Sequence, residues 1–207
     1  MPEMHWLIFD GGTCMSHFDV FNGDADGLCA LHQLRLSQPL QNSLITGVKR
    51  DISLLAKVEA HSGDTVTVLD ISLDKNRQAL DELLAKGVKI IYFDHHYAGE
   101  DLTQHENLET YINTSPETCT SLLVNDYLNG QYLPWAVAAA FGDNLHASAR
   151  QAAAGLNYTE TQFESLCELG VCLNYNGYGS SLDDLHFKPA DLYLKMKPYA
   201  EPFDFIE

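Results

Sequence analysis

The strongest constraint on the fold is the alternation of strand-like and helix-like segments in the first half of this 207-residue chain. Segments rich in β-branched and aromatic residues predict strands at 18–22, 44–48, 65–69, 88–93 and 108–112. Apolar residues at helical spacing predict helices between the first four of these, at 27–37, 52–61 and 75–86. Such alternation favours a parallel sheet with right-handed crossovers. The predicted fold class is α/β, an open parallel sheet flanked by helices.

The second half of the chain is predicted to be helical. Helices are expected at 117–128, 134–141, 145–156 and 159–174. Residues 176–207 contain three prolines and show weak periodicity, so we expect an extension that packs on the domain or leads toward an absent segment, and a core that folds without it. The predicted organisation is an N-terminal extension at 1–14, one domain at 15–175, and a C-terminal extension or linker toward an absent second domain at 176–207.

Net charge and hydropathy argue against two classes of partner. The 12 Lys and Arg residues are outnumbered by 29 Asp and Glu residues, which gives a net charge of −17. Because a basic face normally binds the phosphates of duplex nucleic acid, we expect no long double-stranded nucleic acid partner. No segment approaches the ~18 apolar residues of a membrane span, so we expect no membrane partner and a cytoplasmic location. Five cysteines without a C-x-x-C pair favour reduced thiols.

Acidic and imidazole side chains follow three of the predicted strands. The first strand leads into Asn22-Gly23-Asp24-Ala25-Asp26-Gly27, the third ends at Asp70, and the fourth ends at Asp94-His95-His96. Another carboxylate, Asp143, follows an apolar helix. In open parallel sheets, ligands bind beyond the carboxyl ends of the strands. We therefore expect these side chains to meet at one edge of the sheet.

The residue types at this edge are those of a divalent metal site. A single aspartate after a strand is ordinarily a helix cap or a loop residue, but several converging carboxylates and imidazoles suit manganese, iron or cobalt. Two metal ions that share a carboxylate activate water and stabilise a phosphoryl group. The pattern thus predicts a metal centre that acts on phosphorylated substrates.

Four motifs, in order, resemble those of the DHH phosphoesterase superfamily: Asn22-Gly23-Asp24-Ala25-Asp26-Gly27, Asp70, Asp94-His95-His96 and Gly142-Asp143-Asn144. The resemblance runs from about residue 17 to about residue 175. It implies metal-dependent hydrolysis of phosphoric esters or anhydrides. The sequence departs from the superfamily in two ways. Many members have aspartate at the position of Asn22, and typical members carry a C-terminal substrate-binding domain with a Gly-Gly-His stretch that nothing after residue 175 matches.

The resemblance also implies residue roles. Metal ligands would be Asp24, Asp70 as a bridge, His95 and Asp143, with Asn22 and Asp26 as weaker or secondary ligands. The expected cofactor is Mn²⁺, with two ions of unequal affinity, and Mg²⁺ or Co²⁺ as alternatives. Asp70 and His96 would be catalytic, with His96 facing the substrate as general acid or phosphate ligand, and Asp94 would orient a histidine.

Three further residues are candidates with an open alternative. Lys49 and Arg50 follow the second strand and would meet substrate phosphate, or form a solvated surface pair. His146 lies one turn beyond Asp143 and would approach the metal site, or stay on the surface.

The expected function is hydrolysis of a small phosphorylated substrate, such as a short oligonucleotide, a nucleotide bisphosphate, a cyclic dinucleotide or a polyphosphate. The alternative is a catalytically weak module of the same fold that binds metal or nucleotide. The sequence leaves a homodimer open.

Overall fold

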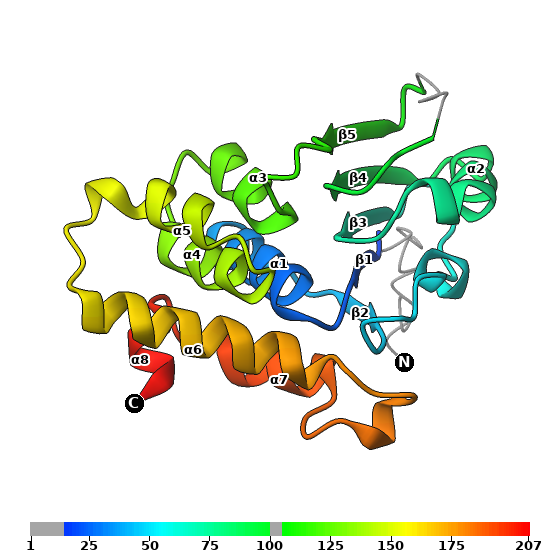
Figure 1. The fold of residues 1–207 in the computed structure, drawn as a ribbon. Helices are drawn as coiled ribbons and strands as arrows, with labels where there is room; N and C mark the ends of the chain where they lie inside the picture. The colour runs from blue at the N-terminus through cyan, green and yellow to red at the C-terminus, as the bar shows by residue number, and fades with distance from the viewer. Residues whose placement is uncertain (1–14, 100–104) are drawn as a thin grey trace, which may run out of the picture.

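The structure is a computed structural model that describes residues 15–99 and 105–207 (Figure 1). The extension expected at 1–14 lies outside the described residues. Within them, the strands are β1 (His17–Phe21), β2 (Ser43–Thr46), β3 (Thr65–Leu69), β4 (Lys89–Asp94) and β5 (Leu108–Ile112). They form one sheet in the order β2-β1-β3-β4-β5, and every neighbouring pair is parallel. The predicted parallel α/β fold is confirmed.

The described helices are α1 (Ala25–Ser37), α2 (Arg77–Ala85), α3 (Thr120–Tyr127), α4 (Leu133–Gly142), α5 (His146–Ala152), α6 (Glu160–Asn176), α7 (Pro189–Met196) and α8 (Pro202–Ile206). Short 3-10 segments occupy Leu54–Lys57, Asp74–Asn76, Ala153–Gly155 and Leu182–Asp184. The six helices from Thr120 onward confirm that the second half of the chain is helical. None of the helices in the described part of the chain is long and apolar enough to cross a membrane.

The helix predicted at 52–61 is wrong, because only the 3-10 turn Leu54–Lys57 forms there. The amide of Asn76 explains the difference. Its Nδ2 donates to the Ile52 carbonyl at 2.7 Å, and its Oδ1 accepts from the Leu55 N–H at 3.3 Å. Backbone groups that a helix would pair internally are thus satisfied by a side chain 24 and 21 residues away.

Alternating strand residues build two hydrophobic layers, one on each face of the sheet. Phe21, Leu69 and Phe93 face a cluster with α1, α3 and α4, whereas Val20 and Val68 face a cluster with α2 and the Leu54–Lys57 turn. This follows from the two-residue period of a strand. In Figure 1 the strand arrows point toward α1, α3 and α4, so the carboxyl ends of the strands meet the helical half of the molecule.

The C-terminal segment packs on the domain, and its buried side chains argue against the expectation that the core folds without residues 176–207. Leu192, Tyr193 and Met196 of α7 are buried in the cluster that contains α1 and α4. The helices α7 and α8 are short and each begins at a proline, which explains why sequence periodicity did not reveal them. That this segment leads toward a second domain stays a prediction.

Two buried side chains bind the turn between α7 and α8. His32 Nε2 donates to the Tyr199 carbonyl at 2.8 Å, and Trp135 Nε1 donates to the Ala200 carbonyl at 2.9 Å. The two rings also contact each other edge to face, with centroids 4.6 Å apart. Burial lowers the pKa of His32 from 6.5 to about 4.

We predict that acid destabilises the protein through His32. Its folded-state pKa lies below the unfolded value, so between pH 6.5 and about 4 only the unfolded chain gains a proton there, and stability falls as the pH falls. The loss should reach roughly 3 kcal/mol, at 1.36 kcal/mol for each pKa unit. Urea unfolding of wild type and His32→Gln at pH 7.5 and 4.5 measures it. Glutamine keeps a donor for Tyr199 without titrating, so equal pH dependence in both proteins would refute the prediction.

Candidate metal centre

The site is built on strands that end level with one another. Phe21 of β1 pairs with Leu69 of β3, and Leu69 pairs with Phe93 of β4. The next residue on each strand is polar: Asn22, Asp70 and Asp94. The chain reverses its direction of winding between β1 and β3, because β2 lies on one side of β1 and β3 on the other. Crevices at such switch points are the usual ligand sites of open α/β sheets.

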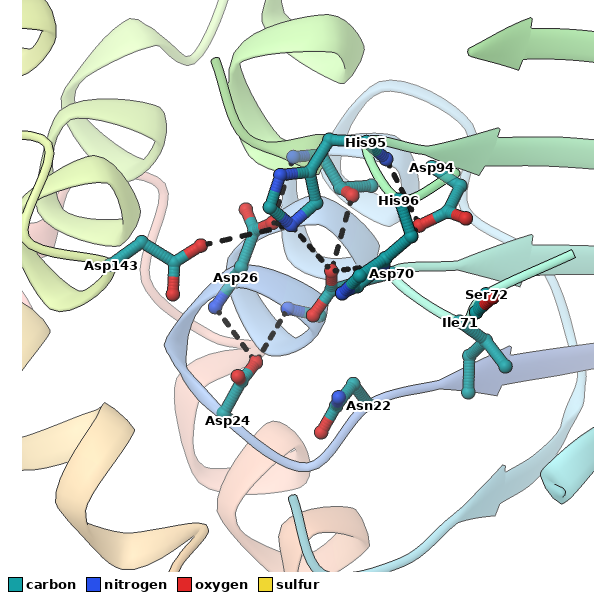
Figure 2. A network of polar contacts seen from close by, with 12 residues as sticks. Asn22, Asp24, Asp26, Asp70, Ile71, Ser72, Asp94, His95, His96 and Asp143 are labelled. Carbon is teal, nitrogen blue, oxygen red and sulfur yellow. Dashed lines mark hydrogen bonds and ion pairs between the residues drawn. The ribbon is translucent and has the colours of Figure 1, made fainter. Parts of the chain in front are cut away.

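A cavity of about 370 Å³ lies at this edge of the sheet. The predicted residues that line it are Asn22, Asp24, Lys49, Asp70, His95, His96 and Asp143. Figure 2 shows Asp26, Asp70 and Asp143 around the ring of His95, with Asp24 beside the start of α1. The residues that line the cavity come from five separate segments of the sequence.

Asp24 caps α1 and also faces the cavity. Its Oδ1 accepts from the Asp26 and Gly27 N–H groups at 3.1 and 3.2 Å. Its Oδ2 lies 2.6 Å from Lys49 Nζ. The cap fixes the carboxylate at the start of the helix, where the helix dipole favours a negative charge.

Asp26 is wholly buried and binds the start of α3. Its two carboxylate oxygens accept from the Thr120 and Ser121 N–H groups, each at 2.7 Å. This explains why α3 begins at Thr120 and not at the predicted residue 117. Asp26 Oδ2 also lies 3.8 Å from His95 Nε2. Asp26 thus holds the loop in place, and its role as a secondary metal ligand stays a prediction.

Asp70 has an unusual backbone conformation, with φ at +58° in the left-handed region. Its N–H donates to the Phe93 carbonyl at 3.0 Å, and Thr120 Oγ1 donates to its Oδ1 at 3.3 Å. Aspartate tolerates this conformation better than most residues, and such strain is concentrated at functional sites. Burial, followed by the charges of Asp26 and Asp24, raises the pKa of Asp70 well above its ordinary value.

The imidazole of His95 lies at the centre of the carboxylates. Its Nε2 is 3.4 Å from Asp70 Oδ1, 3.8 Å from Asp26 Oδ2 and 4.0 Å from Asp143 Oδ2. Two of these separations are too long for hydrogen bonds. Among the described residues, two sets have possible ligand atoms that all lie within 4.8 Å of one another: Asp70, His95 and His96, and Asp26, Cys119 and Asp143.

Asp94 orients His96. Its Oδ1 accepts from His96 Nδ1 at 2.7 Å and from the His95 N–H at 2.9 Å. The hydrogen bond predicted between Asp94 and a histidine is therefore present, and His96 is its partner. This hydrogen bond raises the pKa of His96. The His96 side chain is 44% exposed at the cavity wall, where a bound substrate can reach it.

Asp143 follows α4 and faces both His95 and Lys49, with its Oδ1 3.7 Å from Lys49 Nζ. Burial and the charges of Asp26 and Asp24 raise the pKa of Asp143 to about 7.

The pKa of Lys49 lies above its ordinary value. Burial alone would lower this pKa, but the charges of the adjacent Asp24 and Asp143 outweigh the effect of burial. Lys49 Nζ also donates to Asn174 Oδ1 at 2.7 Å.

Two predicted candidates lie away from the cavity. Arg50 is exposed and does not line it. His146 is exposed, and its ring packs against Phe141 with centroids 5.4 Å apart. Asp51 and Ser72, which sequence reasoning missed, line the cavity because they follow β2 and β3. Asp70 was identified because ligands bind beyond the carboxyl ends of parallel strands, and the same rule applies to Asp51 and Ser72. No sequence signal pointed to Asn174.

The donor set fits a hard divalent cation. Carboxylate oxygens and imidazole nitrogens line the same cavity, and a bound cation would stabilise like charges held together in a buried site. Among the described residues, the buried Asn22 Oδ1 and Asp94 Oδ2 have no hydrogen-bond partner. Asn22 lines the cavity, and its role as a neutral metal ligand stays a prediction.

The fold is shared with two known structures. The manganese-bound exonuclease RecJ superposes with a TM-score of 0.59 at 15% identity, over 92% of this chain and 59% of RecJ. A DHH domain from a member of a family of ribosomal proteins gives 0.53 at 14%, over 89% and 56%. The chain thus spans less than two thirds of either structure. No family model and no curated protein matches it. The chain has the fold of a DHH-superfamily domain.

Proposed function

We propose that this chain is a divalent-metal-dependent hydrolase of phosphoric esters or phosphoanhydrides that acts on a small substrate. The observation that carries the proposal is the convergence of Asp70, His95 and Asp143 on one cavity at the switch point of the sheet. The mixture of carboxylate and imidazole donors supports Mn²⁺ as the ion, and the RecJ structure that shares the fold contains manganese.

In this proposal each side chain has a defined task. Asp70, His95 and Asp143 would hold the metal ion, which when bound would act as a Lewis acid and activate water. His96 donates a proton to the leaving oxygen from Nε2, because its Nδ1 is held by Asp94. Asp94 keeps the ring in place and stabilises its protonated form.

The size and charge of the site favour a small substrate. A cavity of about 370 Å³ is at the low end of the range for small-molecule sites. The chain has few cations for a long phosphate backbone. Candidates are short oligonucleotides, nucleotide bisphosphates, cyclic dinucleotides and short polyphosphates.

A substrate panel tests the proposal. Purified protein is incubated with one member of each candidate class and with Mn²⁺, Mg²⁺, Co²⁺ or EDTA, and product release is measured. We expect hydrolysis of at least one class with Mn²⁺ and none with EDTA. Saturable Mn²⁺ binding without hydrolysis of any class would refute the proposal and favour the alternative, a metal- or nucleotide-binding module.

We predict that His96→Ala slows turnover by roughly 10²–10⁴-fold, the usual effect of losing a positioned acid–base group. Mn²⁺ affinity should change little, because Asp70, His95 and Asp143 remain. Calorimetric titration with Mn²⁺ and steady-state kinetics on the best substrate measure the two effects. His95→Ala is the matched control and should weaken Mn²⁺ binding. Unchanged turnover in His96→Ala would exclude it as the general acid.

A further inference from the structure

The one ammonium group among the described residues that lines the acidic cavity is that of Lys49. Its Nζ lies 2.6 Å from Asp24 Oδ2, 2.7 Å from Asn174 Oδ1 and 3.7 Å from Asp143 Oδ1. An ammonium has three N–H donors. Three oxygens already surround this ammonium, and two of them belong to the predicted metal ligands Asp24 and Asp143.

The backbone fixes the lysine in this place. The Lys49 N–H donates to the Gly177 carbonyl at 2.8 Å, which joins the end of β2 to the end of α6. The ring of Tyr178 lies 5.6 Å from Nζ and covers it on the outer side. A Cβ on Gly177 would lie 3.2 Å from the Cα and Cβ atoms of Asp24, so the segment after α6 passes close to this residue. Lys49 is thus held against Asp24 by contacts on two sides.

The neighbouring Asn22 strengthens this pattern. Its Nδ2 lies 3.5 Å from the Lys49 carbonyl, and as an amide it brings no charge to the site. Asp24, whose other oxygen caps α1, therefore has the ammonium as its nearest cationic partner among the described residues. The side of the cavity near Asn22 and Asp24 is already neutralised.

The charge of the site then suits one divalent ion. Asp26 is stabilised by hydrogen bonds from the N–H groups at the start of α3, Asp94 by its hydrogen bond to His96, and Asp51 by Lys57 Nζ at 2.6 Å. The remaining carboxylates that line the cavity are Asp24, Asp70 and Asp143. With all three ionised, one ammonium leaves two negative charges, which equals the charge of one divalent cation. A second divalent ion would leave the buried site with a net positive charge.

We infer that the Lys49 ammonium takes the place of a second divalent cation, and that the chain holds a single metal ion beside Asp70, His95 and Asp143. This inference rests on the proposed function and departs from the two ions expected from the sequence resemblance. Lys49 supplies the fixed positive charge at Asp24 that a second ion would otherwise provide.

Mn²⁺ stoichiometry tests the inference without any substrate. Isothermal titration calorimetry gives the number of ions per chain, and electron paramagnetic resonance shows whether two bound Mn²⁺ ions lie close enough to couple. We expect one uncoupled ion in wild type and two coupled ions in Lys49→Met, which keeps the length of the side chain and removes its charge. Arg50→Met, a change at the exposed neighbouring residue, is the matched control and should bind one ion.

Asp24→Asn adds a second readout. Its amide oxygen can still cap α1, so folding should be retained. In the wild-type background it should change Mn²⁺ affinity less than about threefold, because Asp24 binds Lys49 and not the ion. In the Lys49→Met background it should lower the stoichiometry from two to one. If Lys49→Met lacks a cooperative melting transition, Lys49→Ala replaces it with the same expected result.

Each outcome decides between the claims. Two ions in wild type, or one ion in a folded Lys49→Met or Lys49→Ala protein, would overturn the role of Lys49 while leaving the proposed metal-dependent function intact. Absence of saturable Mn²⁺ binding in wild type and in every variant would overturn the proposed function itself. One ion in wild type and two in the lysine variants would support both.

Discussion

Asp70→Asn should abolish high-affinity Mn²⁺ binding, lower turnover by roughly 10³-fold and make the metal-free protein more stable. The carboxylate is buried near four others, and its Oδ1 lies 3.4 Å from His95 Nε2, where it would hold the ion together with this histidine. A metal ion contributes several kcal/mol to catalysis, and ~4 kcal/mol corresponds to about 10³-fold in rate. Asparagine also tolerates the left-handed backbone at this position, so the change removes charge with little added strain.

The expected gain in stability follows from the sign of the pKa shift. The folded-state pKa of Asp70 is raised, so as the pH rises past the unfolded value the unfolded chain loses its proton first, and stability falls. At neutral pH the raised pKa of Asp70 therefore costs stability, and asparagine avoids this cost. Thermal melts with EDTA and calorimetry with Mn²⁺ measure the two effects. Asp74→Asn, at a carboxylate that does not line the cavity, is the control. Tight Mn²⁺ binding by Asp70→Asn would contradict the assignment.

Deletion of residues 189–207 should leave a chain without a cooperative unfolding transition. It removes the buried Leu192, Tyr193 and Met196 and takes away the carbonyl partners of His32 and Trp135. Burial of three such side chains contributes roughly 5–9 kcal/mol, which is comparable with the ~5–15 kcal/mol stability of a typical domain. Circular dichroism during thermal and urea unfolding measures the loss.

A graded pair of substitutions on α7 accompanies the deletion. Met196→Ala removes a fully buried side chain and should cost about 2–5 kcal/mol. Leu194→Ala, at a side chain of the same helix that is 55% exposed, should change stability by less than about 0.5 kcal/mol. A cooperative melt of the truncated chain near the wild-type temperature would show that α7 and α8 are dispensable.

The sheet and the edge that carries the site could be predicted from the sequence. The strands Thr65–Leu69 and Leu108–Ile112 lie at the predicted positions, because β-branched or apolar residues bounded by polar ones are a local signal. Asp70 and Asp94 could be placed together because the carboxyl ends of neighbouring parallel strands share one edge. Both inferences use only residues adjacent in sequence and a general rule of sheet topology.

The features that escaped prediction depend on contacts between distant segments. Asp26 sets the start of α3 through residues 94 and 95 positions later, and Asn76 prevents a helix at 52–61. Lys49 was expected near the site, but its contacts with Asn174 and Gly177 of a distant segment, which hold it in the cavity, were not. Neither spacing nor periodicity encodes such contacts, so they could not be derived before the structure.

The central claim is that the cavity at the carboxyl ends of β1, β3 and β4 is a divalent metal centre. Crystals grown with Mn²⁺ and measured at a wavelength where manganese scatters anomalously test it most directly. We expect an anomalous difference peak roughly 2.0–2.6 Å from an Asp70 carboxylate oxygen, the range for oxygen ligands of divalent ions, with His95 Nε2 and Asp143 also bound. No peak in this cavity at millimolar Mn²⁺, or peaks only at carboxylates outside it, would contradict the claim.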